Sequence, residues 1–299
     1  MIQQPAHLKK GDKIAIVCPA KKLPKRIDDA VALLEEWGLE VIIGESVYAA
    51  DHQFAGSDTL RCADMQRFLD DPDIKAIIAG RGGYGTIRII DELDFTLFNE
   101  SPKWIVGFSD ITVLLSHVFA QSGAMSIHGQ MPYTFGDASA ASLTSLYNAL
   151  FGHANSYSIA PAAFNIPGKA EGVLTGGNLT LLVMLEGSAS EMDFTDKILF
   201  LEDVGEQESS VDRMMRMLKR SGKLAKLKGL IVGAFNEIEE EVIPFGESPA
   251  EIIHGLVKEY GYPVCFDFPV GHIDDNRALI LGQSVVLSID AHTVSLNPS

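Results

Sequence analysis

The stretch Ile14-Ala15-Ile16-Val17 is a short, wholly apolar run that ends just before Cys18-Pro19. A run of this kind is typical of a strand that is buried on both faces of a parallel sheet. Downstream, apolar residues recur at helical spacing, and these are Ile27, Val31, Leu34 and Trp37. Gly38 then stands where a helix C-cap is expected. The stretch therefore predicts the first strand–helix unit of an α/β fold.

The alternation of strand-like and helix-like segments continues to about residue 120. Further strands are expected at 40–43, 74–79 and 104–106, and further helices at 58–69, 86–93 and 111–120. Strands that alternate with helices in this way are typical of a doubly wound α/β sheet. We therefore predict such a sheet for the first half of the chain.

Residues 136–168 are poor in periodicity and rich in Ala, Ser, Asn and Pro, which is typical of a connection between domains. We place an N-terminal domain at 1–150, a linker at 151–168 and a C-terminal domain at 169–299. The second half mixes both kinds of element, with helices expected to open at Asn178, at 211 and after Ser248, and strands expected at 198–201, 230–235, 278–281, 285–289 and 293–296. This pattern predicts a smaller α+β domain with a small mixed sheet.

Composition narrows the classes of protein. The chain has 299 residues, and its 24 basic and 40 acidic residues give a formal net charge of −16, which disfavours nucleic acid as a partner. The cysteines are Cys18, Cys62 and Cys265, which are widely spaced, so we expect reduced thiols and neither a disulfide nor a zinc site. We find no apolar h-region and no apolar run near the roughly 20 residues that span a bilayer. We therefore expect a cytoplasmic protein without a membrane partner.

One segment favours nucleophilic catalysis. In Trp104-Ile105-Val106-Gly107-Phe108-Ser109-Asp110, a strand runs through a tight turn into a helix, which places Ser109 at the carboxyl edge of the sheet. The amide of Asp110 is then free to bind an oxyanion formed by attack of Ser109. On this segment alone, the commoner interpretation is that either residue is an ordinary helix N-cap. Ile111 also departs from the G-x-S-x-G pattern of hydrolases.

A nucleophilic serine needs a base and an orienting carboxylate. His117 lies on the same predicted helix, about 12 Å from the serine, and is too far away. His128 and His272 both follow segments that reach a sheet edge, and spacing alone does not choose between them. Glu202 and Asp203 directly follow the apolar strand 198–201. They are either partners of a base or caps of the following turn.

The segment Gly80-Arg81-Gly82-Gly83-Tyr84-Gly85 follows a predicted strand and matches G-x-G-x-x-G. A dinucleotide site is one interpretation, but the motif lies in the third strand–helix unit and Glu100, the acid about 20 residues on, is in a loop-like stretch. The other interpretation is that the glycines bring backbone amides close to the oxyanion.

These motifs together resemble the L,D-carboxypeptidase family of serine peptidases, which includes muramoyl-tetrapeptide carboxypeptidases and microcin C immunity peptidases. The resemblance runs nearly end to end. The motifs that carry it are Leu8-Lys9-Lys10-Gly11-Asp12, Phe54-Ala55-Gly56-Ser57-Asp58 with Arg61, Arg81-Gly82-Gly83-Tyr84-Gly85, Gly107-Phe108-Ser109-Asp110, His128-Gly129, Leu174-Thr175-Gly176-Gly177-Asn178-Leu179, Leu201-Glu202-Asp203-Val204 with Asp212-Arg213, and Gly271-His272.

The resemblance implies a fold and a triad. The fold is a flavodoxin-like N-terminal domain with a smaller α+β C-terminal domain. The triad is Ser109 as nucleophile, His272 as general base and then acid, and Glu202 as the carboxylate that orients His272. The first domain supplies the serine and the second supplies the other two residues.

The resemblance also implies an oxyanion hole formed by the amide of Asp110 and by a glycine, either Gly82 or Gly83. Substrate binding is assigned to Arg81 and Asn178, which are donors for a free carboxylate. The alternatives are a surface ion pair for Arg81 and a helix N-cap for Asn178.

The function implied is that of a serine carboxypeptidase that releases terminal D-alanine from murein tetrapeptides in cell-wall recycling. Such an enzyme needs no metal or cofactor, takes a small muropeptide as substrate and is expected to be a homodimer. One alternative is a microcin C-type peptidase that cleaves aminoacyl-adenylate carboxamides. Another, from a different class, is a non-catalytic module that binds a nucleotide at Gly80–Gly85.

Overall fold

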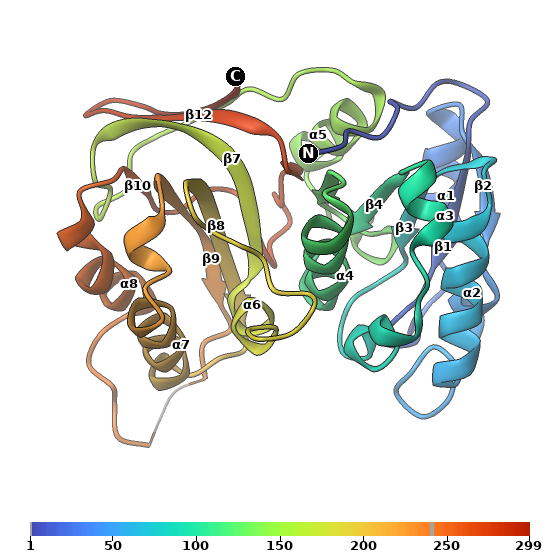
Figure 1. Ribbon diagram of the computed structural model, residues 1–299, viewed down its shortest axis with the longest axis horizontal. Helices are drawn as coiled ribbons and strands as arrows, with labels where there is room; N and C mark the ends of the chain where they lie inside the picture. The colour runs from blue at the N-terminus through green and yellow to red at the C-terminus, as the bar shows by residue number, and fades with distance from the viewer. Residues whose placement is uncertain (1, 240–241) are drawn as a thin grey trace. The chain divides into compact units, whose positions relative to one another are not determined.

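The computed structural model describes residues 2–239 and 242–299, which form two compact units (Figure 1). The first unit comprises the chain up to His153 with Gly187–Glu191 and Asp274–Gly282, and the second comprises Ala154–Glu186, Met192–Ile273 and Gln283–Ser299. Across the residues described, no helix combines the length and the apolar character needed to cross a membrane.

The first unit is built on a six-stranded sheet with the order β11-β5-β4-β3-β1-β2. Its strands are β1 (Lys13–Val17), β2 (Glu40–Ile43), β3 (Ile74–Ala79), β4 (Trp104–Gly107), β5 (Ser126–His128) and β11 (Leu279–Leu281). All neighbouring pairs are parallel except β11 with β5. The order of the parallel strands, β2-β1-β3-β4-β5, is that of a flavodoxin-like sheet. The predicted fold class of the first half is therefore confirmed.

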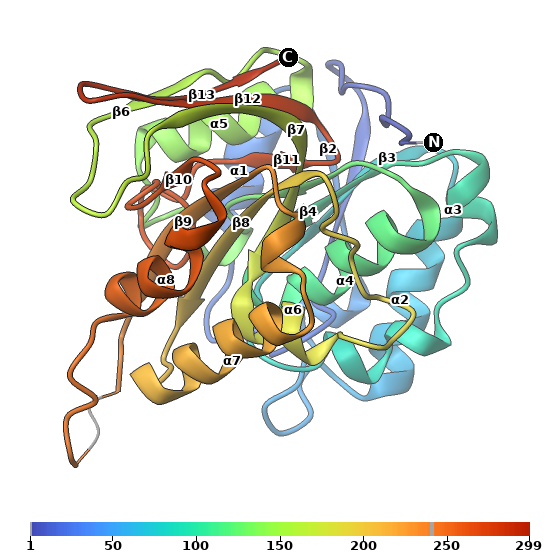
Figure 2. The ribbon, with the colours of Figure 1, turned by 60° about the vertical axis from the view of Figure 1, so that its left-hand side comes forward.

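Helices cover both faces of this sheet. They are α1 (Asp28–Glu36), α2 (Asp58–Asp70), α3 (Thr96–Glu100), α4 (Thr112–His117) and α5 (Ala140–Phe151). Helices α1 and α5 pack on one face, over Ile14 and Ile16, and α2 and α4 lie on the other face (Figure 2). Because consecutive strand residues point to opposite faces, a strand covered on both sides must be apolar throughout. For this reason the short apolar runs in the sequence predicted these strands.

Two predicted helices of the first unit differ in detail. The segment 86–93 forms two short 3₁₀ helices, Thr86–Arg88 and Ile90–Glu92, in place of one α-helix. The segment 111–120 is divided between α4 and a π-helical turn, Val118–Ser122, that ends at Gly123 in the left-handed conformation. Both differences affect helix type and leave the strand order unchanged.

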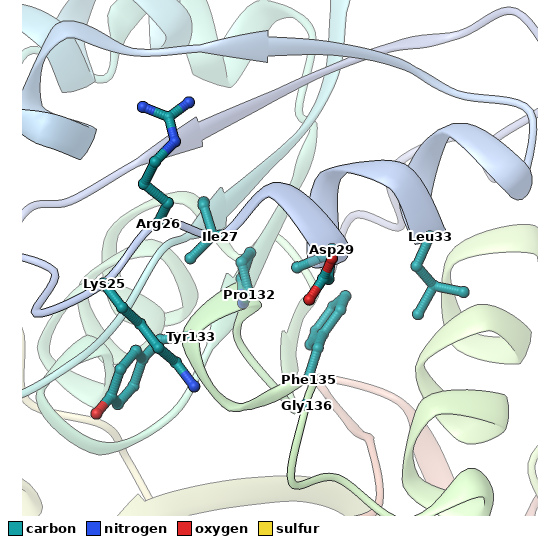
Figure 3. Close-up of a pocket in the computed structure, with 10 residues that line it drawn as sticks. Lys25, Arg26, Ile27, Asp29, Leu33, Pro132, Tyr133, Phe135 and Gly136 are labelled. Atoms are coloured by element: carbon teal, nitrogen blue, oxygen red, sulfur yellow. The ribbon is translucent and has the colours of Figure 1, made fainter.

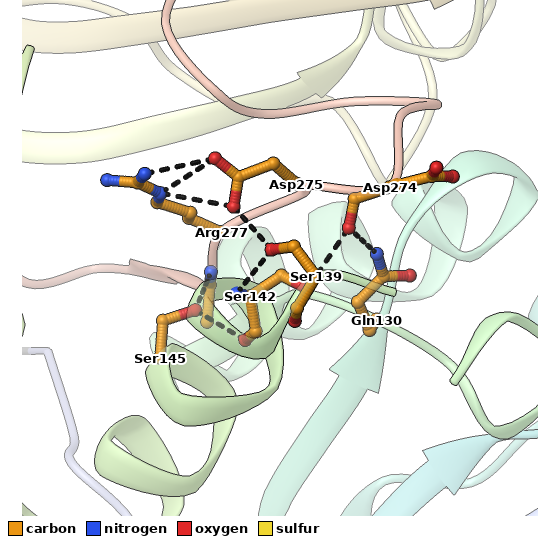
Figure 4. A network of polar contacts seen from close by, with 8 residues as sticks. Gln130, Ser139, Ser142, Ser145, Asp274, Asp275 and Arg277 are labelled. Carbon is orange, nitrogen blue, oxygen red and sulfur yellow. Dashed lines mark hydrogen bonds and ion pairs between the residues drawn. The ribbon is translucent and has the colours of Figure 1, made fainter. Parts of the chain in front are cut away.

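The expectation of a connection at 136–168 was wrong for its first half, because α5 lies there and buries Leu146 and Leu150. Serines at the N-cap of α5 and on the helix find hydrogen-bond partners in the segment that leads into β11 (Figure 4). Ser139 Oγ donates to the Asp275 carboxylate at 2.6 Å, and Ser145 Oγ accepts the Ala278 N–H at 2.8 Å. These contacts assign β11 to the first sheet, although it was expected in the second domain.

The second unit contains a seven-stranded mixed sheet with the order β10-β9-β8-β7-β12-β13-β6. Its strands are β6 (Tyr157–Ile159), β7 (Gly168–Asn178), β8 (Lys197–Val204), β9 (Gly229–Asn236), β10 (Val264–Cys265), β12 (Ser284–Ile289) and β13 (Val294–Pro298). The long, curved β7 joins two regions of the sheet, since its first half pairs antiparallel with β12 and its second half pairs parallel with β8 (Figure 1). Helices α6 (Leu179–Met184), α7 (Glu208–Arg220) and α8 (Pro249–Val257) lie together on one face (Figure 2).

The second sheet confirms a mixed α/β unit but is larger than expected. The predicted linker 151–168 contains β6, which pairs with β13 at the sheet edge. The helix expected after Ser248 is present, and its N-terminus is a capping box formed with Glu251. The observed division thus differs from the three predicted segments, because two short pieces of the second half belong to the first unit.

Candidate active site

Ser109 lies directly after β4 in a backbone conformation that a serine rarely adopts. Its φ is +63°, in the left-handed region, and it opens a 3₁₀ turn that leads into α4. A non-glycine residue in this region costs free energy, and such residues are concentrated at functional sites. The strand–turn–helix geometry predicted for this segment is present.

The glycine loop after β3 passes close to Ser109. A Cβ built on Gly82 would lie 2.9 Å from Ser109 Cβ, 3.1 Å from Ser109 Oγ and 3.3 Å from the Asp110 amide nitrogen. Gly83, with φ of +117°, instead faces the Lys21 side chain, which would lie 2.5 Å from an added Cβ. Only a residue without a side chain fits at Gly82, and of the two glycines it is the one beside Ser109.

Asp110 holds this loop through its side chain. The carboxylate is buried and accepts the Thr86 N–H at 2.9 Å. Burial raises the pKa of Asp110, and the hydrogen bonds from the loop partly oppose that rise. Asp110 therefore links the turn of Ser109 to the end of the glycine loop.

Arg61 links the same loop to the end of β1. Its guanidinium is fully buried and donates to the carbonyls of Pro19 and Gly85 and to the Asp58 carboxylate. These acceptors satisfy the two terminal nitrogens of a buried guanidinium, whose burial would otherwise be costly. Arg61 belongs to a motif of the sequence, but nothing in that motif indicates this role.

In the second unit, a buried carboxylate faces a histidine. Glu202 Oε2 lies 2.7 Å from His272 Nδ1, and the two side chains are 0% and 20% exposed. Burial lowers the pKa of His272, but the hydrogen bond and the charge of Glu202, with a contribution from Asp203, raise it by more, so the pKa lies above its ordinary value. The bond at Nδ1 leaves Nε2 as the nitrogen that accepts a proton.

The pair is positioned by neighbours that sequence analysis missed. Gly271 has φ of +118°, and a Cβ there would lie 2.9 Å from Glu202 Cβ, so only glycine lets the two segments approach. Asn236 Nδ2 donates to the His272 carbonyl at 2.7 Å. Both residues fix the backbone of His272, and neither has a sequence signal beyond the adjacency of Gly271 and His272.

Asp203, the second of the two acids near the end of strand β8, has a separate set of partners. Asn178 Nδ2 donates to it at 2.8 Å, and the Thr180 N–H and hydroxyl donate at 2.9 Å each. Burial, together with the negative charge of Glu202, raises the pKa of Asp203 to about 6. The two adjacent acids therefore differ, since one faces His272 and the other faces the start of α6.

The remaining predicted residues lie as follows. Asn178 is the N-cap of α6, accepting the Leu181 N–H at 3.2 Å. Arg81 donates to the Lys22 carbonyl at 3.0 Å and stacks on the ring of Tyr133. The alternative base, His128, is fully buried at the end of β5, with Nε2 3.2 Å from the Asn276 side-chain oxygen.

Comparison with known proteins agrees with this geometry. Residues 14–129 match the LD-carboxypeptidase N-terminal domain, and residues 171–287 match the LD-carboxypeptidase C-terminal domain. The chain is similar to the probable murein peptide carboxypeptidase of Bacillus subtilis, with 33% identity over 95% of this chain and 91% of that protein.

Two solved structures are similar over nearly the whole chain. The muramoyltetrapeptide carboxypeptidase from Oxalobacter formigenes is 32% identical, has a TM-score of 0.86, and is matched over 96% of this chain and 98% of its own. MccF in complex with glutamyl sulfamoyl guanosine has a TM-score of 0.88 at 21% identity, covering 99% of this chain and 98% of its own. At that identity the second likeness concerns the fold alone.

Proposed function

This chain belongs to the LD-carboxypeptidase family, and from that premise we propose that it is a serine L,D-carboxypeptidase that releases terminal D-alanine from murein tetrapeptides. Carboxypeptidase activity follows from the family, which excludes the interpretation as a non-catalytic nucleotide-binding module. The proposed part is the substrate, L-Ala-γ-D-Glu-meso-diaminopimelate-D-Ala, and the residues that act on it.

The observation that carries the proposal is the 2.7 Å hydrogen bond between Glu202 and His272. A buried carboxylate that holds Nδ1 fixes the tautomer in which Nε2 is a base, as the general-base half of a serine triad requires. Ser109 is the proposed nucleophile, and its left-handed φ in the turn after β4 supports this role. The triad combines one residue of the first unit with two of the second.

In the proposed mechanism, Ser109 Oγ attacks the carbonyl carbon of diaminopimelate while His272 Nε2 takes the hydroxyl proton. The amides of Asp110 and Gly82 or Gly83 bind the oxyanion, and Gly82 is favoured because it lies beside Ser109. The carbon–nitrogen bond then breaks, His272 gives its proton to the departing D-alanine amine, and water activated by His272 hydrolyses the acyl-enzyme.

Arg81 and Asn178 remain the proposed substrate-binding residues. Arg81 is supported by its position directly before Gly82, and Asn178 by its bond to Asp203, which neighbours Glu202. From the family resemblance we also propose that the enzyme acts in the cytoplasm, in peptidoglycan recycling, and as a homodimer.

The test is mass-spectrometric detection of D-alanine released from the tetrapeptide by the wild type and by Ser109→Ala, Glu202→Ala and His272→Ala. We expect release by the wild type and severe loss in all three variants. An aminoacyl sulfamoyl nucleoside serves as the second substrate, because cleavage of it with no release from the tetrapeptide would favour a microcin C-type peptidase. An alanine variant with full activity would refute the role given to that residue.

A further inference from the structure

The loop between β1 and α1 is basic in a chain that is strongly acidic. Four cationic side chains lie within Lys21–Arg26, whereas the formal net charge of the chain is −16. In a flavodoxin-like sheet, ligands bind outside the carboxyl ends of the strands, at the switch point between β1 and β3. The basic loop starts at this point, just after the end of β1, and the glycine loop that passes Ser109 starts at the end of β3.

A pocket of about 130 Å³ opens beside the basic loop, within the first unit (Figure 3). One wall is formed by Lys25 and the start of α1, and the other by Pro132, Tyr133 and Phe135 in the turn that follows β5. Asp29 also lines the pocket, near Phe135. The site therefore combines an aromatic wall with groups that recognise charge, as ligand sites commonly do.

Two cationic side chains lie against the ring of Tyr133. Lys25 Nζ lies 5.7 Å from the centre of its ring, and Arg81 Cζ lies 4.8 Å from it. Within the described residues, neither cation has an ion pair with a carboxylate. Arg26 differs, because Asp28 already binds its guanidinium at 2.8 and 2.9 Å. Lys25 and Arg81 are thus two positive groups beside one tyrosine ring, and neither is neutralised by a carboxylate among the described residues.

The pocket is connected to the candidate nucleophile by short contacts inside the first unit. The Tyr133 N–H donates to the Gly80 carbonyl at 3.0 Å, at the start of the glycine loop. Arg81 follows Gly80 and directly precedes Gly82, which lies against Ser109. Arg81 is thus one residue from the glycine that lies against Ser109, and the two residues before the scissile bond of an extended peptide span about 7 Å.

We propose that Lys25, Arg81 and Tyr133 form a subsite for the free α-carboxylate of D-glutamate in the peptide stem. This inference rests on the proposed function and deepens it. In the tetrapeptide, D-glutamate is joined through its γ-carboxyl, so its α-carboxylate stays charged, one residue before the diaminopimelate whose carbonyl is attacked. The subsite assigns Arg81 to the stem, and leaves the carboxylate of the terminal D-alanine to other donors.

The experiment compares two substrates that differ at one group. One is L-Ala-γ-D-Glu-meso-diaminopimelate-D-Ala, and the other carries an α-carboxamide on the second residue in place of the carboxylate. kcat and KM for D-alanine release are measured for the wild type, Lys25→Met, Tyr133→Leu and the control Lys9→Met. Lys9→Met makes the same charge change at an exposed site before β1. This site lies at the amino-terminal end of the strand, whereas the basic loop follows its carboxyl end.

We expect the wild type and Lys9→Met to show a KM about fivefold higher for the carboxamide, the scale of one solvated ion pair. Lys25→Met should show a smaller KM difference between the two peptides, because only the carboxylate form loses one of its two cationic partners. Tyr133→Leu should reduce the KM preference for the carboxylate peptide, because it removes the ring on which both cations lie. Circular-dichroism melting identifies any variant that fails to fold.

Equal KM values for the two peptides in the wild type would overturn the subsite, and so would an undiminished preference in Lys25→Met. If the wild type releases no D-alanine from either peptide, the proposed function fails instead. The subsite is then decided by calorimetric binding of the tripeptide L-Ala-γ-D-Glu-meso-diaminopimelate and its carboxamide to the wild type and Lys25→Met. Absence of binding, or equal binding of both ligands by the wild type, would refute it.

Discussion

Substituting Glu202 by glutamine keeps the volume of this side chain but removes the charge that faces His272. The side chain is 0% exposed and lies 2.7 Å from Nδ1, so the hydrogen bond is charge-assisted and shielded from water. A hydrogen bond to a charged group contributes about 1.5–3 kcal/mol, and its loss alone corresponds to roughly a 10- to 150-fold lower rate. The substitution is therefore expected to act on catalysis far more than on packing.

A second effect adds to this loss. A glutamine amide that donates to Nδ1 places the imidazole proton on Nε2, and this tautomer does not accept a proton from serine. Loss of the orienting carboxylate in a serine triad costs about 10⁴ in kcat. We therefore expect Glu202→Gln to lower kcat/KM for D-alanine release by about 10²- to 10⁴-fold.

The pH dependence of kcat/KM provides an independent test, because the role of Glu202 predicts the direction in which the acid limb moves. Glu202 holds the pKa of His272 above its ordinary value, against the effect of burial. Because the base must be neutral to accept a proton, kcat/KM falls as the pH drops through that pKa. In Glu202→Gln, burial acts unopposed by this charge and disfavours the imidazolium. The acid limb should therefore move to lower pH.

The assay is kcat/KM for D-alanine release between about pH 5 and about pH 9, the range in which histidine titrates. Wild type is compared with Glu202→Gln and with Glu202→Asp, which restores the charge on a shorter side chain. Thermal unfolding of each variant controls for loss of structure. An unchanged acid limb, or near-wild-type activity in a folded Glu202→Gln, would refute the assignment of Glu202.

Three further predictions concern neighbouring groups. Gly82→Ala would place a Cβ 2.9 Å from Ser109 Cβ, so we expect activity to fall by about 10²-fold or more while the protein stays folded. Gly255→Ala, outside the pocket, is the control, because an added Cβ there meets nothing within 4 Å. Asp110→Asn weakens the acceptor of a buried backbone N–H and should lower the free energy of unfolding in urea by about 1–3 kcal/mol; unchanged stability would contradict the loop-holding role. Asp203 has its pKa raised to about 6 in the folded state, so the folded form binds this proton more tightly and the free energy of unfolding should fall as the pH rises from about 4 to about 6. Urea titrations across this range should show a shallower fall in Asp203→Asn, and an identical pH dependence would contradict the shift.

The parallel strands of the first unit could be predicted because burial on both faces leaves continuous apolar runs. The segment 279–281 has the same local pattern, and nothing in it says which sheet it joins. It pairs with β5 because Ser145 and its neighbours on α5 bind the preceding backbone, a contact between segments far apart in the sequence. Helix α5 was not predicted for a related reason. Its buried face includes serines whose hydrogen-bond partners are distant in the sequence, so the face does not show an apolar pattern.

Strand β7 was also not predicted. It contains four glycines, which weaken any strand pattern, and Gly176 and Gly177 both have positive φ. The strand forms because it is paired on both sides over successive halves of its length. This pairing depends on strands that are distant in the sequence, so the local sequence does not predict it.

The residues of the candidate site also differ in whether the sequence predicts them. The turn that carries Ser109 is a local feature, so the sequence showed it. Glu202 and His272 lie 70 residues apart, and only the family resemblance paired them. Arg61 and Asn236 contact backbone carbonyls, and a backbone partner leaves no recognisable residue pair in the sequence.

Covalent labelling with a serine-directed fluorophosphonate, followed by mass-spectrometric peptide mapping, tests the central claim most directly. We predict a single adduct on the peptide that contains Ser109 in the wild type, strongly reduced labelling in His272→Ala, and none in Ser109→Ala. Labelling at another residue, or release of D-alanine by Ser109→Ala at the wild-type rate, would contradict the assignment of Ser109 as the nucleophile.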